Sequence, residues 1–160
     1  RVLFRSPLPV VFEAFPGAAK GYCSYVEQRI VIQPGMSQVQ TIKTLVHEVA
    51  HAKLHSPLDI LEETRPDRST REVEAESVAY VVCQHFGIDT ADYSFAYVAD
   101  WSRGKDLEVL KASIGRIHAL AAELIAGIEG PEKELQKAPS HRQRKAGRTA
   151  RRRRQDAPAR

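Results

Sequence analysis

The sequence predicts an α+β domain in which a short antiparallel β-hairpin packs on a mainly helical bundle. Three observations predict this class. Two short runs rich in aromatic and β-branched residues come first, longer stretches with apolar residues three and four positions apart follow, and turn residues separate these segments. The length of 160 residues suits one domain with a single hydrophobic core and excludes a large multidomain enzyme.

The predicted hairpin consists of residues 22–26 and 29–33. Both runs are rich in residues that favour strands, and two polar residues separate them, which is typical of two short antiparallel strands. The Pro34-Gly35 pair is expected to end the second strand. Residues 1–20 are rich in Pro and Phe and show little periodicity, so we expect an irregular lead-in there.

The first two helical segments each begin at a candidate capping box, in which a Ser side chain and a residue three positions later satisfy backbone N–H groups. Ser37 with Gln40 opens the first segment, which is expected to end at about His55. Ser69 with Glu72 opens the second segment, which is expected to end at a Phe-Gly pair.

Two further helical segments are predicted at residues 91–101 and 107–128. The second of them has an apolar stripe with helical spacing, made of Leu110, Ile114, Ile117, Ala121, Leu124, Ile125 and Ile128. A Gly-Pro pair then ends it.

Basic residues concentrate at the C-terminal end of the chain. Residues 136–160 contain ten Lys or Arg and one Asp, whereas residues 1–135 contain 14 basic and 19 acidic residues. The tail has almost no large apolar side chain, so we expect residues 131–160 to be disordered. Two interpretations stay open. The tail is either an arm that binds nucleic acid without base specificity, through Arg151, Arg152, Arg153 and Arg154 among others, or a solvated tail with no partner.

Several function classes are excluded by composition. No apolar run approaches the roughly 18 residues that a membrane span needs, and no signal peptide opens the chain. The two cysteines, Cys23 and Cys83, exclude a disulfide framework and a four-cysteine zinc site. We therefore expect a cytoplasmic protein that does not engage a membrane. The chain begins with Arg1 rather than Met, as expected of a piece of a longer product.

The chemistry centres on the pattern His47-Glu48-x-x-His51 within the first predicted helix. Residues four apart lie on one helix face, so the two imidazoles can bind one metal ion. Zinc suits this ligand type, although manganese or iron can occupy the same ligands. Glu48 can act as the general base that takes a proton from water. The alternative is an amphipathic helix whose two histidines simply lie at the surface.

The third ligand decides the type of site. Zinc proteases with a third histidine would have it at position 57, after a glycine at 54, and this chain has Pro57 and Leu54 there. His55 continues the four-residue spacing, but it lies about 12 Å along the helix axis from His47, too far for one tetrahedral ion. We expect His55 at the helix end or behind a ligand.

A carboxylate from the second helical segment is the remaining candidate. Glu72 and Glu76 share a helix face, whereas Glu74 is rotated by about 200° from Glu72 and is expected to point away. The spacing alone leaves Glu72 and Glu76 open as ligands, and it leaves open that Glu72 only closes the capping box on Ser69.

These residues carry a resemblance to the ImmA/IrrE-type and ArdC-type zincin domains of mobile genetic elements, and the later segments are more similar to the ArdC-like branch. The resemblance spans residues 20–129. The matching stretches are Leu45-Val46-His47-Glu48-Val49-Ala50-His51, Glu72-x-x-Ala75-Glu76-x-x-Ala79, Cys83-Gln84-His85-Phe86-Gly87-Ile88 and Tyr97-x-x-x-Trp101.

The resemblance implies a minimal zincin-like domain of the gluzincin type over residues 21–130, with one zinc ion. It implies Glu72 as the third ligand and Glu76 as the carboxylate that orients a ligating histidine, and the reverse assignment stays open. It further implies roles in cleaving regulators of mobile elements or stress responses, or in protecting plasmid DNA from restriction. ArdC-like members usually carry a preceding DNA-binding module that is not present here, which fits its loss or truncation.

Tyr97, Trp101 and Cys83 are further candidates for the site. Tyr97 and Trp101 are four apart and can line a cleft, with the Tyr97 hydroxyl stabilising an oxyanion, or they can be core packing. Cys83 is expected to be a small buried hydrophobe.

Two functional hypotheses follow. The first is a zinc metallopeptidase that cleaves a protein partner, such as a DNA-bound regulator reached with help from the basic tail. The second is a non-proteolytic, DNA-associated antirestriction-type protein in which the metal is structural and the tail provides the affinity.

Overall fold

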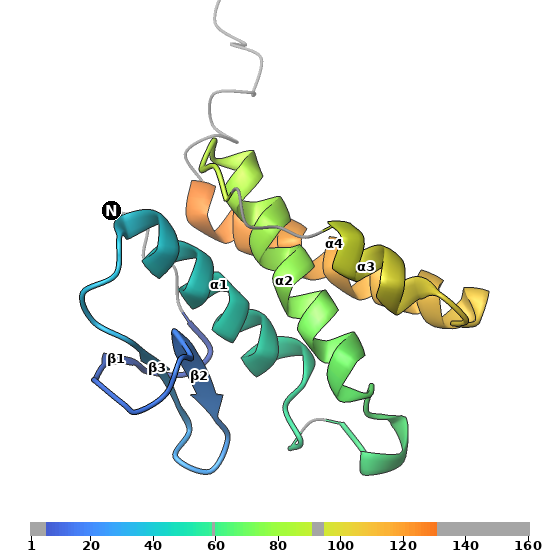
Figure 1. The fold of residues 1–160 in the computed structure, drawn as a ribbon, viewed down its shortest axis with the longest axis horizontal. Helices are drawn as coiled ribbons and strands as arrows, with labels where there is room; N and C mark the ends of the chain where they lie inside the picture. Colours follow the sequence, from blue (N-terminus) through green and yellow to red (C-terminus); the bar gives the residue numbers. More distant parts are fainter. Residues whose placement is uncertain (1–5, 59, 91–94, 131–160) are drawn as a thin grey trace, which may run out of the picture. The chain divides into compact units, whose positions relative to one another are not determined.

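The computed structural model describes residues 6–58, 60–90 and 95–130, and it gives the side chains of all of these except 95–97 (Figure 1). It confirms the α+β class. The elements in chain order are the strands β1 (Val10–Phe12), β2 (Gly21–Ser24) and β3 (Arg29–Ile32), helix α1 (Gln38–Leu54), the short 3₁₀-helix η1 (Glu62–Thr64), and helices α2 (Arg68–His85), α3 (Phe95–Ser102) and α4 (Leu107–Glu129).

The three strands form one small mixed sheet in the order β1-β3-β2. Strands β2 and β3 pair antiparallel, which confirms the predicted hairpin with slightly shorter strands. Strand β1 pairs parallel with β3, with Val10 opposite Ile30. This strand lies in the segment expected to be irregular. Its partner is 20 positions further along the chain, so no hairpin signal marks it.

The two central helices begin at different kinds of cap. The Ser37 side chain accepts a hydrogen bond from the backbone N–H of Gln40 at 3.2 Å, which confirms the predicted start of α1. Helix α2 begins earlier than predicted, because Asp67 accepts from the backbone N–H of Thr70 at 2.7 Å. The prediction of a capping box at Ser69 is wrong, since that residue lies inside the helix.

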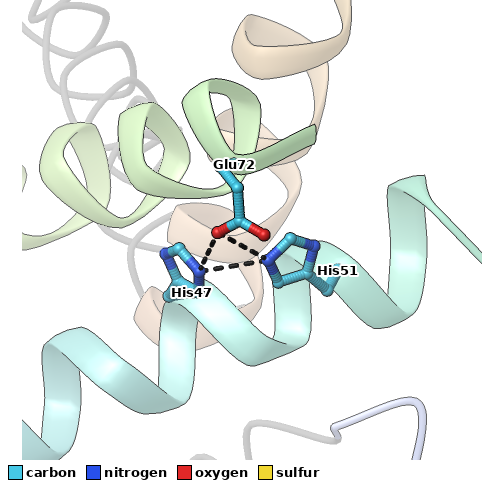
Figure 2. A group of neighbouring side chains, drawn as sticks. All are labelled: His47, His51 and Glu72. Carbon is cyan, nitrogen blue, oxygen red and sulfur yellow. Dashed lines mark hydrogen bonds and ion pairs between the residues drawn. The ribbon is translucent and has the colours of Figure 1, made fainter. Parts of the chain in front are cut away.

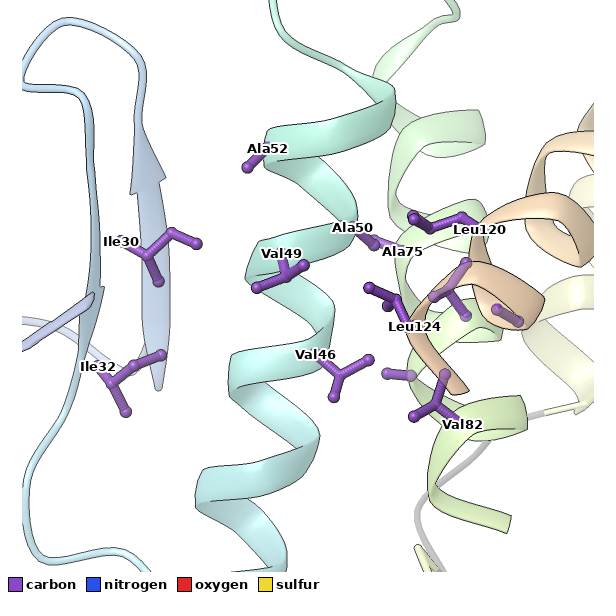
Figure 3. Close-up of a cluster of buried hydrophobic side chains, with 13 residues drawn as sticks. Ile30, Ile32, Val46, Val49, Ala50, Ala52, Ala75, Val82, Leu120 and Leu124 are labelled. Atoms are coloured by element: carbon purple, nitrogen blue, oxygen red, sulfur yellow. The ribbon is translucent and has the colours of Figure 1, made fainter. Parts of the chain in front are cut away.

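The core lies on both sides of α1 (Figure 3). The sheet packs on one side of this helix, through Ile30 and Ile32 of β3, and α2 and α4 lie on the other side. The fully or nearly buried residues of this core are Ile30, Ile32, Val46, Val49, Ala50, Ala52, Ala75, Val78, Ala79, Val82, Leu120, Ala121 and Leu124. Helix α1 is thereby fixed in the middle of the domain, which is where the candidate site lies.

The predicted stripe of α4 is only partly correct. Ala121 and Leu124 are buried in the core, as expected, but Ile114 is 65% exposed and Leu120 is buried in addition. The buried apolar residues of α4 therefore lie in the second half of the helix. None of the helices in the described part of the chain is long and apolar enough to cross a membrane.

The start of α2 contacts the end of α3 and the residues that follow it. Trp101 donates from its indole nitrogen to the Thr70 hydroxyl at 3.0 Å, and Lys105 lies 2.6 Å from the Asp67 carboxylate. Lys105, with the N–H of Thr70, holds the pKa of Asp67 well below its usual range. Trp101 thus has a structural contact on α2.

Candidate metal centre

Helices α1 and α2 lie side by side and bring three candidate ligands together (Figure 2). His47 and His51 are one turn apart on α1, and their Nε2 atoms are 3.1 Å apart. A carboxylate oxygen of Glu72, on α2, lies 3.6 Å from Nε2 of His47 and 3.7 Å from Nε2 of His51. The three ligand atoms are within 4.8 Å of one another, so His47, His51 and Glu72 can hold one metal ion.

Glu76 contacts His47 at the other nitrogen of its ring. Its carboxylate is 3.3 Å from Nδ1 of His47 and 2.7 Å from the ammonium group of Lys43. In this position Glu76 accepts the Nδ1–H of His47 and directs Nε2 toward Glu72 and His51. The geometry therefore favours Glu72 over Glu76 as the ligand, as the resemblance implied.

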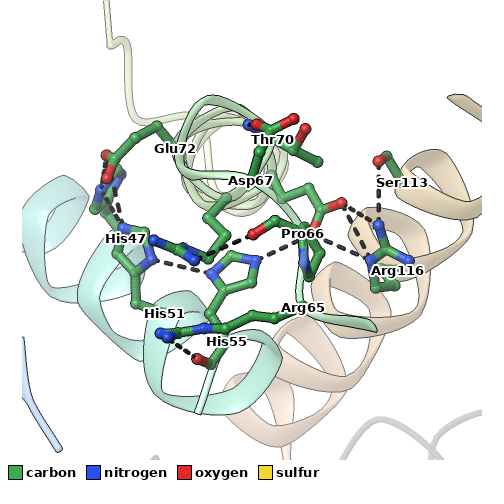
Figure 4. A network of polar contacts seen from close by, with 12 residues as sticks. His47, His51, His55, Arg65, Pro66, Asp67, Thr70, Glu72, Ser113 and Arg116 are labelled. Atoms are coloured by element: carbon green, nitrogen blue, oxygen red, sulfur yellow. Dashed lines mark hydrogen bonds and ion pairs between the residues drawn. The ribbon is translucent and has the colours of Figure 1, made fainter. Parts of the chain in front are cut away.

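A buried chain of polar contacts extends behind His51 (Figure 4). Nδ1 of His51 lies 3.0 Å from Nδ1 of His55, which is the C-cap residue of α1, and Nε2 of His55 lies 3.0 Å from Glu74. Arg116 on α4 then binds the Glu74 carboxylate with two of its nitrogens. His55 thus lies behind a ligand, as expected. Glu74 points away from Glu72, as expected, but sequence reasoning did not identify Arg116 as its partner.

The hydrogen-bond network fixes the tautomers of both histidine ligands. Glu74 is a carboxylate, so His55 donates to it from Nε2 and its Nδ1 can only accept. His51 must then donate from Nδ1, which leaves the lone pair of its Nε2 directed at the site. The contact with Glu76 has the same consequence for His47.

Three electron-rich atoms therefore face one another, two imidazole nitrogens and one carboxylate oxygen. Such a group is repulsive unless a cation lies among its members, so the donor set fits a metal ion. A proton on Nε2 of His47 can supply this positive charge in place of a metal ion, and the pKa values describe that protonated form. Burial opposes protonation of His47, but the hydrogen bonds to Glu72 and Glu76 outweigh it and raise its pKa to about 9. The hydrogen bond from the protonated His47 to Glu72 holds the pKa of Glu72 far below its usual range.

Glu48 lies next to the three candidate ligands and is only 7% exposed. Burial raises the pKa of its carboxyl group to about 7; His47 opposes this shift, and Glu72 adds to it. The backbone N–H of Cys23, on strand β2, hydrogen-bonds to Glu48 and favours the charged form. Glu48 is thus held between the sheet and the ligands, where a general base would be needed.

The site opens into a cavity of about 600 Å³ between the sheet, α1 and the start of α2. Besides the three ligands and Glu48, its lining includes Tyr25, whose hydroxyl donates to the backbone carbonyl of His51 at 2.8 Å. Sequence reasoning missed Tyr25, because it lies at the end of a short strand with no motif around it.

The remaining predicted site residues have different outcomes. The side chain of Tyr97 and the four arginines at 151–154 lie outside the described residues, so their predicted roles stay predictions. Trp101 does not line the cavity. Cys83 is fully buried beside the core, as expected of a small hydrophobe.

Comparisons with known proteins show the family of the segment that contains the site. A family model described as the IrrE N-terminal-like domain of peptidases matches residues 5–96, which include every residue of the candidate metal centre. An uncharacterized protein of Bacillus anthracis is 37% identical over 110 residues, which are 68% of this chain and 18% of that protein. The chain thus spans less than a fifth of the length of that relative. No solved structure matches.

Proposed function

The chain belongs to the IrrE N-terminal-like domain family of peptidases, and from this premise we propose that it is a zinc metallopeptidase of the gluzincin type. The observation that carries the proposal is the meeting of His47, His51 and Glu72 beside the buried carboxyl group of Glu48, in a cavity open to substrate. A zinc ion held by the three ligands would polarise the scissile carbonyl group and acidify a water molecule.

The role of Glu48 is proton transfer. Its carboxylate would accept a proton from the attacking water and deliver it to the leaving nitrogen, so that the C–N bond breaks to give a carboxylic acid and an amine. The backbone N–H of Cys23 holds the carboxylate in place during both transfers. Glu76 and His55 keep the imidazoles of the two ligands in the required orientation.

Strand β2 supports a peptide as the substrate. It is an edge strand with β3 on one side only, and Gly21, Tyr22 and Cys23 line the cavity. An edge strand offers unpaired backbone groups, to which an extended peptide can add as a further strand. A polypeptide bound in this way would pass directly over Glu48.

The Glu48→Gln variant tests the proposal, because it removes the base while keeping the size and polarity of the side chain. We expect this variant to bind one zinc ion per chain and to lose peptide hydrolysis, which is measured by mass spectrometry on a defined mixture of peptides. Glu108→Gln is the matched control, since that side chain is exposed on α4. Hydrolysis that survives in the Glu48 variant at the level of the control would refute the proposal.

We place the target among DNA-bound regulators of mobile elements or stress responses, which the family and the positive charge of residues 136–160 support. The second candidate is a DNA-associated antirestriction-type protein with a structural metal, and the same charge favours it. The Glu48→Gln variant separates the two in cells, because only a peptidase loses its function with this change.

A further inference from the structure

The basic residues of the described chain divide into two groups. Most lysines and arginines have a carboxylate partner within 4.0 Å; these are Arg29, Lys43, Lys53, Arg103, Lys105, Lys111 and Arg116. Among the residues that the structure describes, four have none: Lys20, Arg65, Arg68 and Arg71. All four of these line the cavity of the candidate metal centre. Residues 1–135 carry more acidic than basic side chains, so this concentration of unpaired positive charge is not a property of the whole surface.

Three of the four form an arginine cluster, Arg65, Arg68 and Arg71, at the His51 side of the cavity. Arg65 donates to the backbone carbonyl of His55 at 3.1 Å, and Arg71 donates to that of Pro66 at 3.1 Å. Each guanidinium group is thus held in place by a neutral acceptor and keeps other N–H groups for a ligand. One of these, Nε of Arg65, is buried and has no partner among the described residues.

Helix stability does not explain the arginine cluster. Arg68 and Arg71 lie in the first turns of α2, and the first turn contains no acidic residue. The N-terminal end of a helix carries a partial positive charge, so basic side chains there are unfavourable. The N-cap carboxylate of Asp67 offsets the helix dipole, but Asp67 is itself paired with Lys105. The arginine cluster therefore leaves a positive charge at one end of the cavity, where it attracts an anion.

We propose that the arginine cluster binds an acidic side chain of the substrate, so that the enzyme prefers peptides with Asp or Glu a few residues from the bond that is cut. Arginine suits this role, because its planar group binds a carboxylate through two parallel hydrogen bonds. The inference rests on the proposed function, since it names the substrate class of the same site.

An acidic peptide fits the cavity better than a nucleic acid does. Three carboxylates, of Glu48, Glu72 and Glu76, line the same cavity and would repel a continuous row of phosphates. On a peptide, a single acidic side chain can bind the arginine cluster. The uncharged peptide backbone can then lie beside Glu48, Glu72 and Glu76 without repulsion. The edge strand β2, which lines the same cavity, offers backbone pairing to a peptide and not to a nucleic acid.

The experiment measures binding by the zinc-loaded Glu48→Gln protein, so that hydrolysis does not interfere. Two fluorescent peptides are compared by anisotropy, one with Asp and Glu at three positions and one with Asn and Gln at the same positions. We expect the acidic peptide to bind about tenfold more tightly, as one hydrogen-bonded charge pair provides. The preference for the acidic peptide should decrease as the salt concentration rises. It should be lost when the Arg71→Gln substitution is added to the Glu48→Gln protein.

Two further variants control for folding and for overall charge. The Arg68 side chain is exposed and makes no hydrogen bond to another described residue. The Arg68→Gln variant should therefore fold normally and weaken binding of the acidic peptide by a smaller factor. Arg103→Gln removes the same charge from a side chain that is 80% exposed and far from the cavity lining, and it should leave the preference unchanged.

Several results would overturn the inference. They are equal binding of the two peptides, no binding of either, and tighter binding of a single-stranded oligonucleotide through the same arginines. The two proposals fail in different ways. Wild-type protein that cleaves peptides without an acidic preference contradicts only the inference, whereas acidic preference in binding without any cleavage contradicts only the peptidase function.

Discussion

Replacing Arg116 by Met should destabilise the domain by leaving a buried charge without its main partner. Glu74 has no exposed side-chain surface, and Arg116 binds it through Nε at 3.1 Å and through a terminal nitrogen at 2.5 Å. Removing one partner of a buried ion pair typically costs about 3–5 kcal/mol. The Arg116 side chain is itself 35% exposed, so part of the interaction is screened, and we expect a loss of about 2–3 kcal/mol.

Urea unfolding followed by circular dichroism measures this loss, and the melting temperature should fall by about 10 °C. The double variant Glu74→Met/Arg116→Met is the control. It removes both charges, so it should be more stable than the single Arg116 variant. The reasoning would be refuted by an Arg116→Met protein whose free energy of unfolding lies within about 0.5 kcal/mol of the wild-type value. It would also be refuted if the double variant were destabilised by the sum of the two single-variant losses.

Three further predictions concern separate parts of the chain. Asp67→Ala should cost about 1 kcal/mol at neutral pH. The folded-state pKa of Asp67 is lowered, so this difference should persist down to about pH 4 and shrink only as the pH falls further, measured by urea unfolding across pH. A Cβ at Gly115 would meet nothing within 4 Å, so Gly115→Ala should stabilise α4 by about 0.5–1 kcal/mol. A Cβ at Gly21 would lie 2.7 Å from Thr44, so Gly21→Ala should destabilise the domain by about 1–3 kcal/mol. A lower melting temperature for Gly115→Ala, or a higher one for Gly21→Ala, would contradict this. Deleting residues 137–160 should remove most salt-dependent binding to a DNA oligonucleotide, and unchanged binding would exclude the nucleic-acid-binding arm.

The local elements were predictable from sequence because their signals are local. The hairpin, α1 and the long α4 follow from residue type, spacing and caps within one element. The start of α2 was predicted two residues late. Asp67, Ser69 and Thr70 are all capping residue types, and only the contacts of the folded chain select Asp67.

The candidate site divides in the same way. His47, Glu48 and His51 share one helix, so their spacing alone identifies them. Spacing on the next helix left Glu72 and Glu76 open, and only the resemblance implied Glu72. The ion pair of Glu74 and Arg116 joins residues 42 positions apart on different helices, which no periodicity reveals.

The arginine cluster was hidden for a different reason. In the sequence, Arg65, Arg68 and Arg71 belong to a polar loop and the start of a helix, where basic residues are ordinary. The proposed role of these arginines depends on which basic residues lack a carboxylate partner and on which of them line the cavity. Only the folded structure shows this.

The most direct test of the metal centre is the zinc content of the purified protein by mass spectrometry, compared with the Glu72→Gln and Glu76→Gln variants. We predict one zinc ion per wild-type chain, loss of most zinc from the Glu72 variant, and only weakened binding in the Glu76 variant, as expected when a partner of a ligand is changed. Full zinc occupancy in the Glu72 variant, with loss in the Glu76 variant, would contradict the arrangement of ligands proposed for this site.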